Sequence, residues 1–118
     1  MITFEIPIKT VSEANSRSCW QARMRRTKKA RAAARVICAS EINRSYPFPG
    51  RFNYEAKRVI TLTRIGKRRM DTDNLTGSMK AIRDGIADAL EINDGDWRLE
   101  WSYAQEIGKR YSVKVEIR

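Results

Sequence analysis

The apolar and polar positions of this chain follow two different periods, and the change between them predicts alternating strands and helices. Short runs that are β-branched, or apolar at every second position, predict four strands at residues 2–9, 54–65, 97–106 and 111–118. Pro7 restricts the first strand to a sheet edge or a bulge, because proline has no amide hydrogen to donate. Gly108-Lys109 lies between the last two strands and predicts a hairpin there.

Two segments predict helices: residues 20–43, which are rich in Ala, Arg and Lys, and residues 74–90. The first has an apolar face, with Cys38 beside it, made of Ala30, Ala33, Ala34, Ile37 and Ile42. On the second, at about 100° per residue, one compact face gathers Leu75, Met79, Ile82, Ile86, Ala89 and Leu90. The order β-α-β-α-β-β predicts a single α+β (mixed α/β) domain over residues 1–118, with a small mixed sheet and two helices.

The composition of the chain narrows its class. A length of 118 residues with 42% hydrophobic content fits one folded domain. No apolar run approaches the ~20 residues that span a bilayer, and the first residues lack the features of a secretory signal. We therefore expect a cytoplasmic protein without membrane contact. Cys19 and Cys38 have no metal-ligand spacing, so we expect free thiols, with Cys38 buried.

The chain contains no histidine. This absence excludes Ser-His-Asp and Cys-His nucleophile systems, zinc bound by histidine, and a histidine general base. Any hydrolysis by this chain would depend on carboxylates, lysine and bound metal.

Three acids stand out in a molecule whose formal net charge is +10: Asp71, Asp73 and Asp94. The first two follow a basic run of Arg64, Lys67, Arg68 and Arg69. Carboxylates bind hard divalent cations, and surrounding Lys and Arg attract nucleic acid. This combination is typical of an enzyme that cuts a phosphodiester with divalent metal.

On a continuous helix over residues 74–90, Lys80 and Asp84 would share one stripe with Asp73, opposite the core. Lys80 would then lean toward the Asp pair. Structural alternatives stay open for each acid. Asp73 or Asn74 could cap a helix, Asp71 could ion-pair with Arg68 or Arg69, and Lys80 with Asp84 could be a solvated i,i+4 pair. Asp94-Gly95-Asp96 could be only a turn.

A basic arm precedes and enters the first predicted helix, with no acid among its cations: Arg17, Arg23, Arg25, Arg26, Lys28, Lys29, Arg31 and Arg35. Like charges at this density repel one another unless a polyanion binds, so the arm predicts contacts with the DNA backbone. The alternative is a solvated cationic helix. Asn15 could orient a phosphate or cap a turn, and Trp20 could stack on a base, although core packing is the default expectation.

Several of these motifs together resemble the RusA family of Holliday junction resolvases, in the branch carried by phages and prophages. The matching residues are Asp71-Thr72-Asp73-Asn74-Leu75, Lys80-Ala-Ile-Arg-Asp84-Gly-Ile-Ala-Asp88-Ala-Leu90, Asn93-Asp94-Gly95-Asp96, Ser12-Glu-Ala-Asn15-Ser-Arg17 and Gln105. The resemblance implies a homodimeric endonuclease that uses Mg²⁺, with Mn²⁺ as a substitute, and cuts four-way DNA junctions symmetrically. It implies that Asp71, Asp73 and Asp94 bind the metal and that Lys80 is the essential lysine.

The chain departs from the family pattern in two places. Asn93-Asp94 stands where family members often have two acids, which leaves Asp96 as an alternative third acid. Gly77 occupies the family's lysine position, and Lys80 comes three residues later.

We therefore expect a structure-selective endodeoxyribonuclease of recombination and repair in a bacterial or phage-infected cell, with no small-molecule cofactor. Its expected DNA-binding residues are Asn15, Arg17, Arg23, Arg25, Arg26, Lys28, Lys29, Lys67, Arg68 and Arg69. The alternatives are a non-catalytic basic DNA- or RNA-binding module, in which the acids are caps and turns, and a ribosome-associated protein.

Overall fold

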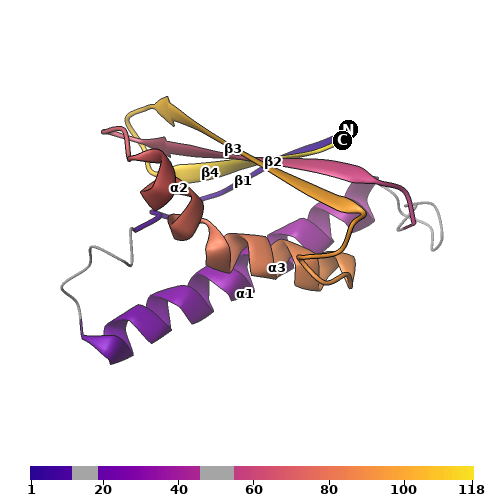
Figure 1. Ribbon diagram of the computed structural model, residues 1–118, viewed down its shortest axis with the longest axis horizontal. Helices are drawn as coiled ribbons and strands as arrows, with labels where there is room; N and C mark the ends of the chain where they lie inside the picture. Colours follow the sequence, from indigo (N-terminus) through magenta and orange to yellow (C-terminus); the bar gives the residue numbers. More distant parts are fainter. Residues whose placement is uncertain (12–18, 46–54) are drawn as a thin grey trace.

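Four strands with alternating side chains form a mixed sheet, and helices cover one of its faces (Figure 1). The computed structural model describes residues 1–11, 19–45 and 55–118. Its elements in order are β1 (Ile2–Ile6), α1 (Trp20–Ser45), β2 (Arg58–Gly66), α2 (Thr72–Ser78), α3 (Lys80–Leu90), β3 (Leu99–Ile107) and β4 (Ser112–Ile117). The predicted α+β class is confirmed.

The strand order is β1-β4-β2-β3, so the predicted hairpin between the last two strands is wrong. β2 lies between β3 and β4, antiparallel to β4 and parallel to β3. The chain does reverse after β3, but the turn passes the end of β2, where the amide of Gly108 donates to the carbonyl of Gly66 at 2.9 Å. A turn signal in the sequence marks where the chain reverses and does not identify which strands pair. β1 is an edge strand, as Pro7 predicted.

The core lies between the sheet and the helices. Register places apolar residues in rows across the strands, such as Ile2 beside Ile117 and Phe4 beside Val115. The helices meet these rows with the predicted faces, whose buried members are Ala34, Cys38, Ile42, Leu75, Met79, Ile82, Ile86 and Leu90. Cys38 is buried as expected, and burial raises the pKa of its thiol to about 12.

Helix α1 contributes to the core along only part of its length. Its buried side chains are Ala34, Cys38 and Ile42, one turn apart, whereas none of residues 20–29 is buried. The helix is roughly 39 Å long at 1.5 Å per residue, so its N-terminal part forms an arm away from the core (Figure 1). Trp20 lies on this arm and is 63% exposed, which contradicts the core packing expected for it. In the described ranges, no helix combines the length and apolarity needed to cross a membrane.

The second predicted helix is divided at Met79 into α2 and α3. Met79 has φ −94° and ψ −3°, in the region between regular helix and turn, and its side chain is fully buried. α3 then crosses α1 closely at Gly85. A Cβ added at Gly85 would lie 2.3 Å from the backbone oxygen of Arg31 and 2.7 Å from the Cβ of Ala34. The absence of a side chain at Gly85 therefore sets the distance between the two helices.

Replacing Gly85 by Ala should destabilise the protein by about 2–3 kcal/mol, because the added methyl meets backbone that has to move. Gly77 is the matched control, since it also lies in a helix but nothing lies within 4 Å of an added Cβ. Gly77→Ala should be neutral or stabilising by about 0.5–1 kcal/mol. Urea unfolding of both variants measures the difference, and equal midpoints would show that α1 and α3 do not need this close contact.

Candidate functional site

Asp71 and Asp73 lie at the start of α2 with exposed side chains. Asp71 is the N-cap residue, but its carboxylate makes no capping hydrogen bond. Asp73 lies inside the first turn, so the interpretation of Asp73 or Asn74 as the cap is wrong. Among the residues described, neither carboxylate has an ion pair, although residues 67–69 are cationic. Both acids therefore retain free oxygen ligands.

The loop that leads into Asp71 is fixed by side chains from the sheet. Gln105 on β3 accepts the amide of Met70 at 2.9 Å through Oε1 and donates to the carbonyl of Met70 at 2.8 Å through Nε2. Arg64 on β2 donates to the carbonyl of Arg68 at 2.6 Å. These bonds hold the backbone that leads to Asp71.

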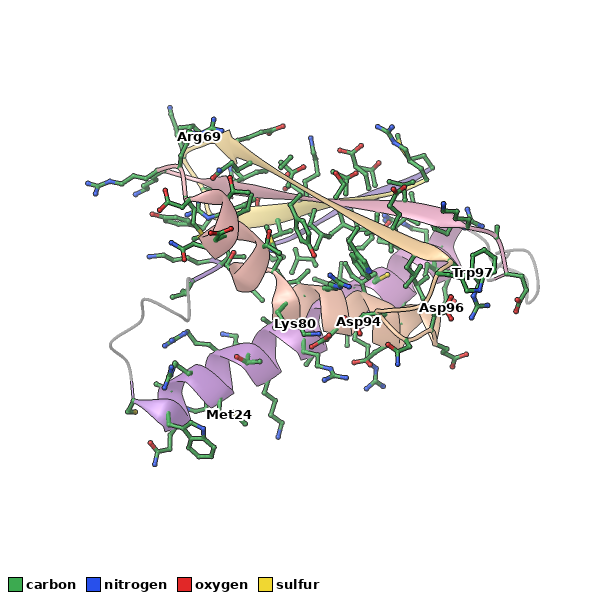
Figure 2. All side chains as sticks on the ribbon, in the orientation of Figure 1. Met24, Arg69, Lys80, Asp94, Asp96 and Trp97 are labelled. Atoms are coloured by element: carbon green, nitrogen blue, oxygen red, sulfur yellow. The ribbon has the colours of Figure 1, made fainter. Side chains whose placement is uncertain are left out.

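Asp94 and Lys80 are in direct contact. Lys80 Nζ lies 2.8 Å from Asp84 Oδ1 and 3.0 Å from Asp94 Oδ2. Figure 2 shows Lys80 next to Asp94. The hydrogen bonds to Asp84 and Asp94 raise the pKa of Lys80, and the hydrogen bond from Lys80 lowers the pKa of Asp94. Lys80 therefore stays protonated and Asp94 stays ionised near neutral pH.

Arg83 and two aromatic residues on β3 hold Asp94 in place. The backbone carbonyl of Asp94 accepts the indole N–H of Trp101 at 2.9 Å and Arg83 Nη2 at 3.2 Å. The Arg83 guanidinium lies 5.0 Å from the Trp101 ring centre and donates to the hydroxyl of Tyr103 at 3.0 Å. Its Nε is also 3.1 Å from Asp94 Oδ2. Asp94 is therefore fixed through both its backbone and its carboxylate.

Two residues of this site, Trp101 and Tyr103, were not predicted from the sequence, and Arg83 and Gln105 were only points of resemblance. The available signal was the alternation of Trp101, Tyr103 and Gln105 at every second position of a predicted strand, which places their side chains on one face. That face is the one toward the helices, as their contacts with α3 and the loop before α2 show.

Asp96 binds Arg98, whereas Asp94 binds Lys80. Asp96 accepts the backbone amide of Arg98 at 2.9 Å and Arg98 Nε at 3.0 Å, and these hydrogen bonds lower the pKa of Asp96. The amide of Gly95 donates to the side chain of Asn93 at 3.0 Å, so the segment is also the turn that the alternative interpretation described. Of the two candidate third acids, Asp94 is the one beside Lys80 (Figure 2).

The structure does not bring all the predicted site residues together. In the described part of the chain Lys80 contacts Asp84 and Asp94, and it makes no hydrogen bond or ion pair with Asp71 or Asp73. The continuous helix expected for residues 74–90 is wrong, whereas the i,i+4 pair of Lys80 with Asp84 is confirmed. Within the part of the chain that the structure describes, no three acid or cysteine side chains are arranged to hold a metal ion.

The expected DNA-binding cations divide between the arm of α1 and the loop before Asp71. Arg25, Lys28 and Lys29 are exposed on α1, and residues 67–69 are exposed on the loop. Arg23 and Arg26 are partly buried, and Asn15 and Arg17 lie outside the described residues. Arg31 and Arg35 were part of the predicted arm as well. Arg31 binds Asp88 through two hydrogen bonds of 2.7 and 3.0 Å and so joins α1 to α3.

Comparisons of this chain with protein-family models, with curated proteins and with solved structures found no match.

Replacing Gln105 by Leu should free the loop before Asp71, because the amide and the carbonyl of Met70 both lose their partner. The expected cost is about 1–3 kcal/mol of stability. Exchange of the Met70 amide hydrogen, followed by NMR, should become faster. Gln105→Glu keeps the acceptor but loses the donor, so it should protect the amide better than Leu does. Unchanged exchange in Gln105→Leu would show that other contacts hold the loop.

Proposed function

We propose that this chain is a Mg²⁺-dependent endonuclease that cuts branched DNA, with four-way junctions as its main substrate. This is the activity of the RusA family, which its motifs resemble. The observation that supports this proposal most directly is that the carboxylates of Asp71 and Asp73 have no structural partner among the described residues. Both carboxylates are exposed, and within the described structure neither has an ion pair or a capping bond, although three cations lie just before them in the chain. Acids that serve only structure would be expected to use such partners.

Asp71 and Asp73 fit Mg²⁺ by the chemistry of their donors. Mg²⁺ prefers oxygen ligands, keeps several waters and commonly uses one or two carboxylates together with substrate phosphate. Asp94 fits less well in this arrangement, because Lys80 and Arg83 already neutralise it. A ligand role for Asp94 would require it to exchange both ion pairs for the metal. When bound, the metal would activate a water and offset charge on the phosphate.

Lys80 would act as a fixed positive charge and not as a base. Asp84 and Asp94 raise its pKa, so the amine keeps its proton under ordinary conditions. Its side chain is 62% exposed, which leaves it accessible to a phosphate. Such a charge stabilises the transition state when it contacts the scissile phosphate. Asp94, ionised and held by Arg83 and Trp101, would position this lysine.

The arm of α1 would bind the DNA backbone. Its exposed cations lie on a part of the helix that does not contribute to the core, so they are available to a large ligand. Electrostatic contacts of this kind supply affinity without sequence preference. In a homodimer, two such sites related by a two-fold axis would match the symmetry of a four-way junction. We place this activity in the cytoplasm of a bacterial or phage-infected cell.

A second candidate is a DNA-binding module without catalysis. It is favoured by one observation, the absence of a three-ligand metal group among the described residues. Such a module would bind a labelled junction and leave it uncut in Mg²⁺.

Replacing Asp71 or Asp73 by Asn should reduce junction cleavage by about 100-fold or more, because several kcal/mol of transition-state stabilisation would be removed. Binding should be kept or tightened, since a negative charge near phosphate is removed. Single-turnover cleavage of a labelled four-way junction in Mg²⁺, and binding in EDTA, measure both effects. Glu100→Gln is the control, since Glu100 is exposed on β3 and lies on the face opposite Trp101.

Wild-type protein that binds the junction without cutting it would establish the binding module instead. A parallel loss of binding and cleavage in a folded Asp71→Asn variant would contradict a metal-ligand role.

Replacing Lys80 by Ala should lower the cleavage rate of bound DNA much more than the affinity, because one of 24 Lys and Arg contributes little to bulk attraction. A transition-state contact affects the rate and not the ground-state binding. Lys80→Arg should recover only part of the rate, since a guanidinium does not replace a point charge. Lys57→Ala removes an exposed lysine just before β2 and serves as the control. Equal rates for Lys80→Ala and wild type at saturating enzyme would leave Lys80 as a surface ion-pair partner only.

A further inference from the structure

Six exposed cations from three distant parts of the sequence meet at one end of the sheet. The strand register shows why. Ile6 of β1 pairs with Val113 of β4, and Gly66 of β2 pairs with Ile107 of β3. Strands β1, β2 and β3 therefore end, and β4 begins, at the same end of the sheet. The residues that follow β1, β2 and β3 at this end of the sheet include six exposed cations. We call them the sheet-end cluster: Lys9, Lys67, Arg68, Arg69, Lys109 and Arg110. Figure 2 shows Arg69 at this end of the molecule.

Tyr111 lies near two cations of the sheet-end cluster that come from different segments. Lys9 Nζ is 4.7 Å from the centre of the Tyr111 ring, and Lys67 Nζ is 5.9 Å from it. The 2.9 Å bond between the amide of Gly108 and the carbonyl of Gly66 joins the turn after β3 to the loop after β2. The three segments are therefore packed against one another, and their cations form a single surface.

The buried side chain of Arg64 connects two of the segments that form the cluster. It is only 6% exposed, and its guanidinium donates to Thr10 Oγ1 at 3.2 Å and to the carbonyl of Arg68 at 2.6 Å. Arg64 therefore links Thr10, the residue after Lys9, to the loop before Asp71. A Cβ at Gly66 would lie 2.9 Å from this guanidinium, so glycine makes room for it. Among the described acids none pairs with Arg64, and its buried charge adds to the positive potential of this end.

The cations of the cluster have no neutralising partner in the described part of the chain. None of the six is ion-paired there, and Glu5, which lines the same surface hollow as Lys109 and Arg110, pairs with neither. Like charges held this close repel one another unless a polyanion binds. Elsewhere on the same molecule, Arg31, Arg98 and Lys114 each have an acid within ion-pair distance.

We propose that the sheet-end cluster is a second binding surface for the phosphate backbone of duplex DNA, separate from the arm of α1. Residues 67–69 were expected to bind DNA from their position before Asp71, and the structure adds Lys9, Lys109 and Arg110 to them. The surface adjoins the candidate metal-binding acids, because only Met70 separates Arg69 of the cluster from Asp71. A DNA strand bound to this surface would lie close to Asp71. This inference rests on the proposed function.

The test is a charge-matched pair of double variants. Lys109→Gln with Arg110→Gln removes two exposed cations of the cluster. Lys57→Gln with Arg118→Gln removes two exposed cations at the opposite end of the sheet, where β2 begins and β4 ends. Binding of a plain DNA duplex is measured in EDTA over a series of NaCl concentrations. The cluster variant should give a slope of log affinity against log salt that is shallower by about 1.8, at about 0.9 for each phosphate that the protein no longer neutralises. The control should keep the wild-type slope.

Three outcomes would overturn the proposal. An unchanged slope in the cluster variant, with wild-type binding and cleavage intact, would remove the surface and leave the proposed function standing. Equal slope changes in both double variants would show that the lower net charge of the protein, and not the position of the cations, weakens DNA binding. Wild-type protein that binds no DNA would remove the proposed function together with this surface. Lys9→Gln provides a second measurement, with an expected slope change about half as large.

Discussion

The parallel pairing of β2 and β3 is the constraint on which the rest of this structure depends. Parallel neighbours cannot be joined by a tight turn, so the chain has to leave the sheet after Gly66, cover one face with α2 and α3, and return at Leu99. The candidate acids lie on this crossover, Asp71 where it begins and Asp94 near where it ends. The returning strand then supplies the side chains that fix both acids.

β3 acts as the support for the whole crossover. Gln105 holds the loop before Asp71 through Met70, and Trp101 holds the carbonyl of Asp94. These residues lie four positions apart on the same face of one strand, so the two ends of the crossover are tied to one rigid element. Contacts to a strand fix a site more closely than contacts within a loop, because the backbone of a paired strand has little freedom.

Charge is distributed unevenly over the molecule. The sheet face opposite the helices carries Glu5, Glu100, Glu106 and Glu116, with Lys114 and Arg118 among them. Within the described residues, exposed cations without an ion pair gather on the arm of α1 and at the sheet end, beside Asp71. A polyanion that approaches this protein is therefore attracted to the side of the molecule that carries the candidate acids.

The sequence by itself determined the local structure and the kind of chemistry that is available. The two periods of apolar residues predicted the helices and strands to within a few residues, and they predicted the buried faces, because burial of an amphipathic face depends on nearby positions alone. The lack of histidine and the isolated acids limited the chemistry to carboxylates, lysine and metal.

Only the tertiary structure decided which strands pair and which side chains meet. The hairpin prediction failed because β2 lies between β3 and β4 and pairs with both. The continuous helix failed at Met79, where α2 ends and α3 begins, and the contact of Lys80 with Asp94 joins residues 14 positions apart. Residues 67–69 were visible as a local basic run, but only strand register brings Lys9 and Lys109 to the same end of the sheet. Long-range pairing is set by the packing of the whole core, and no short window of sequence contains it.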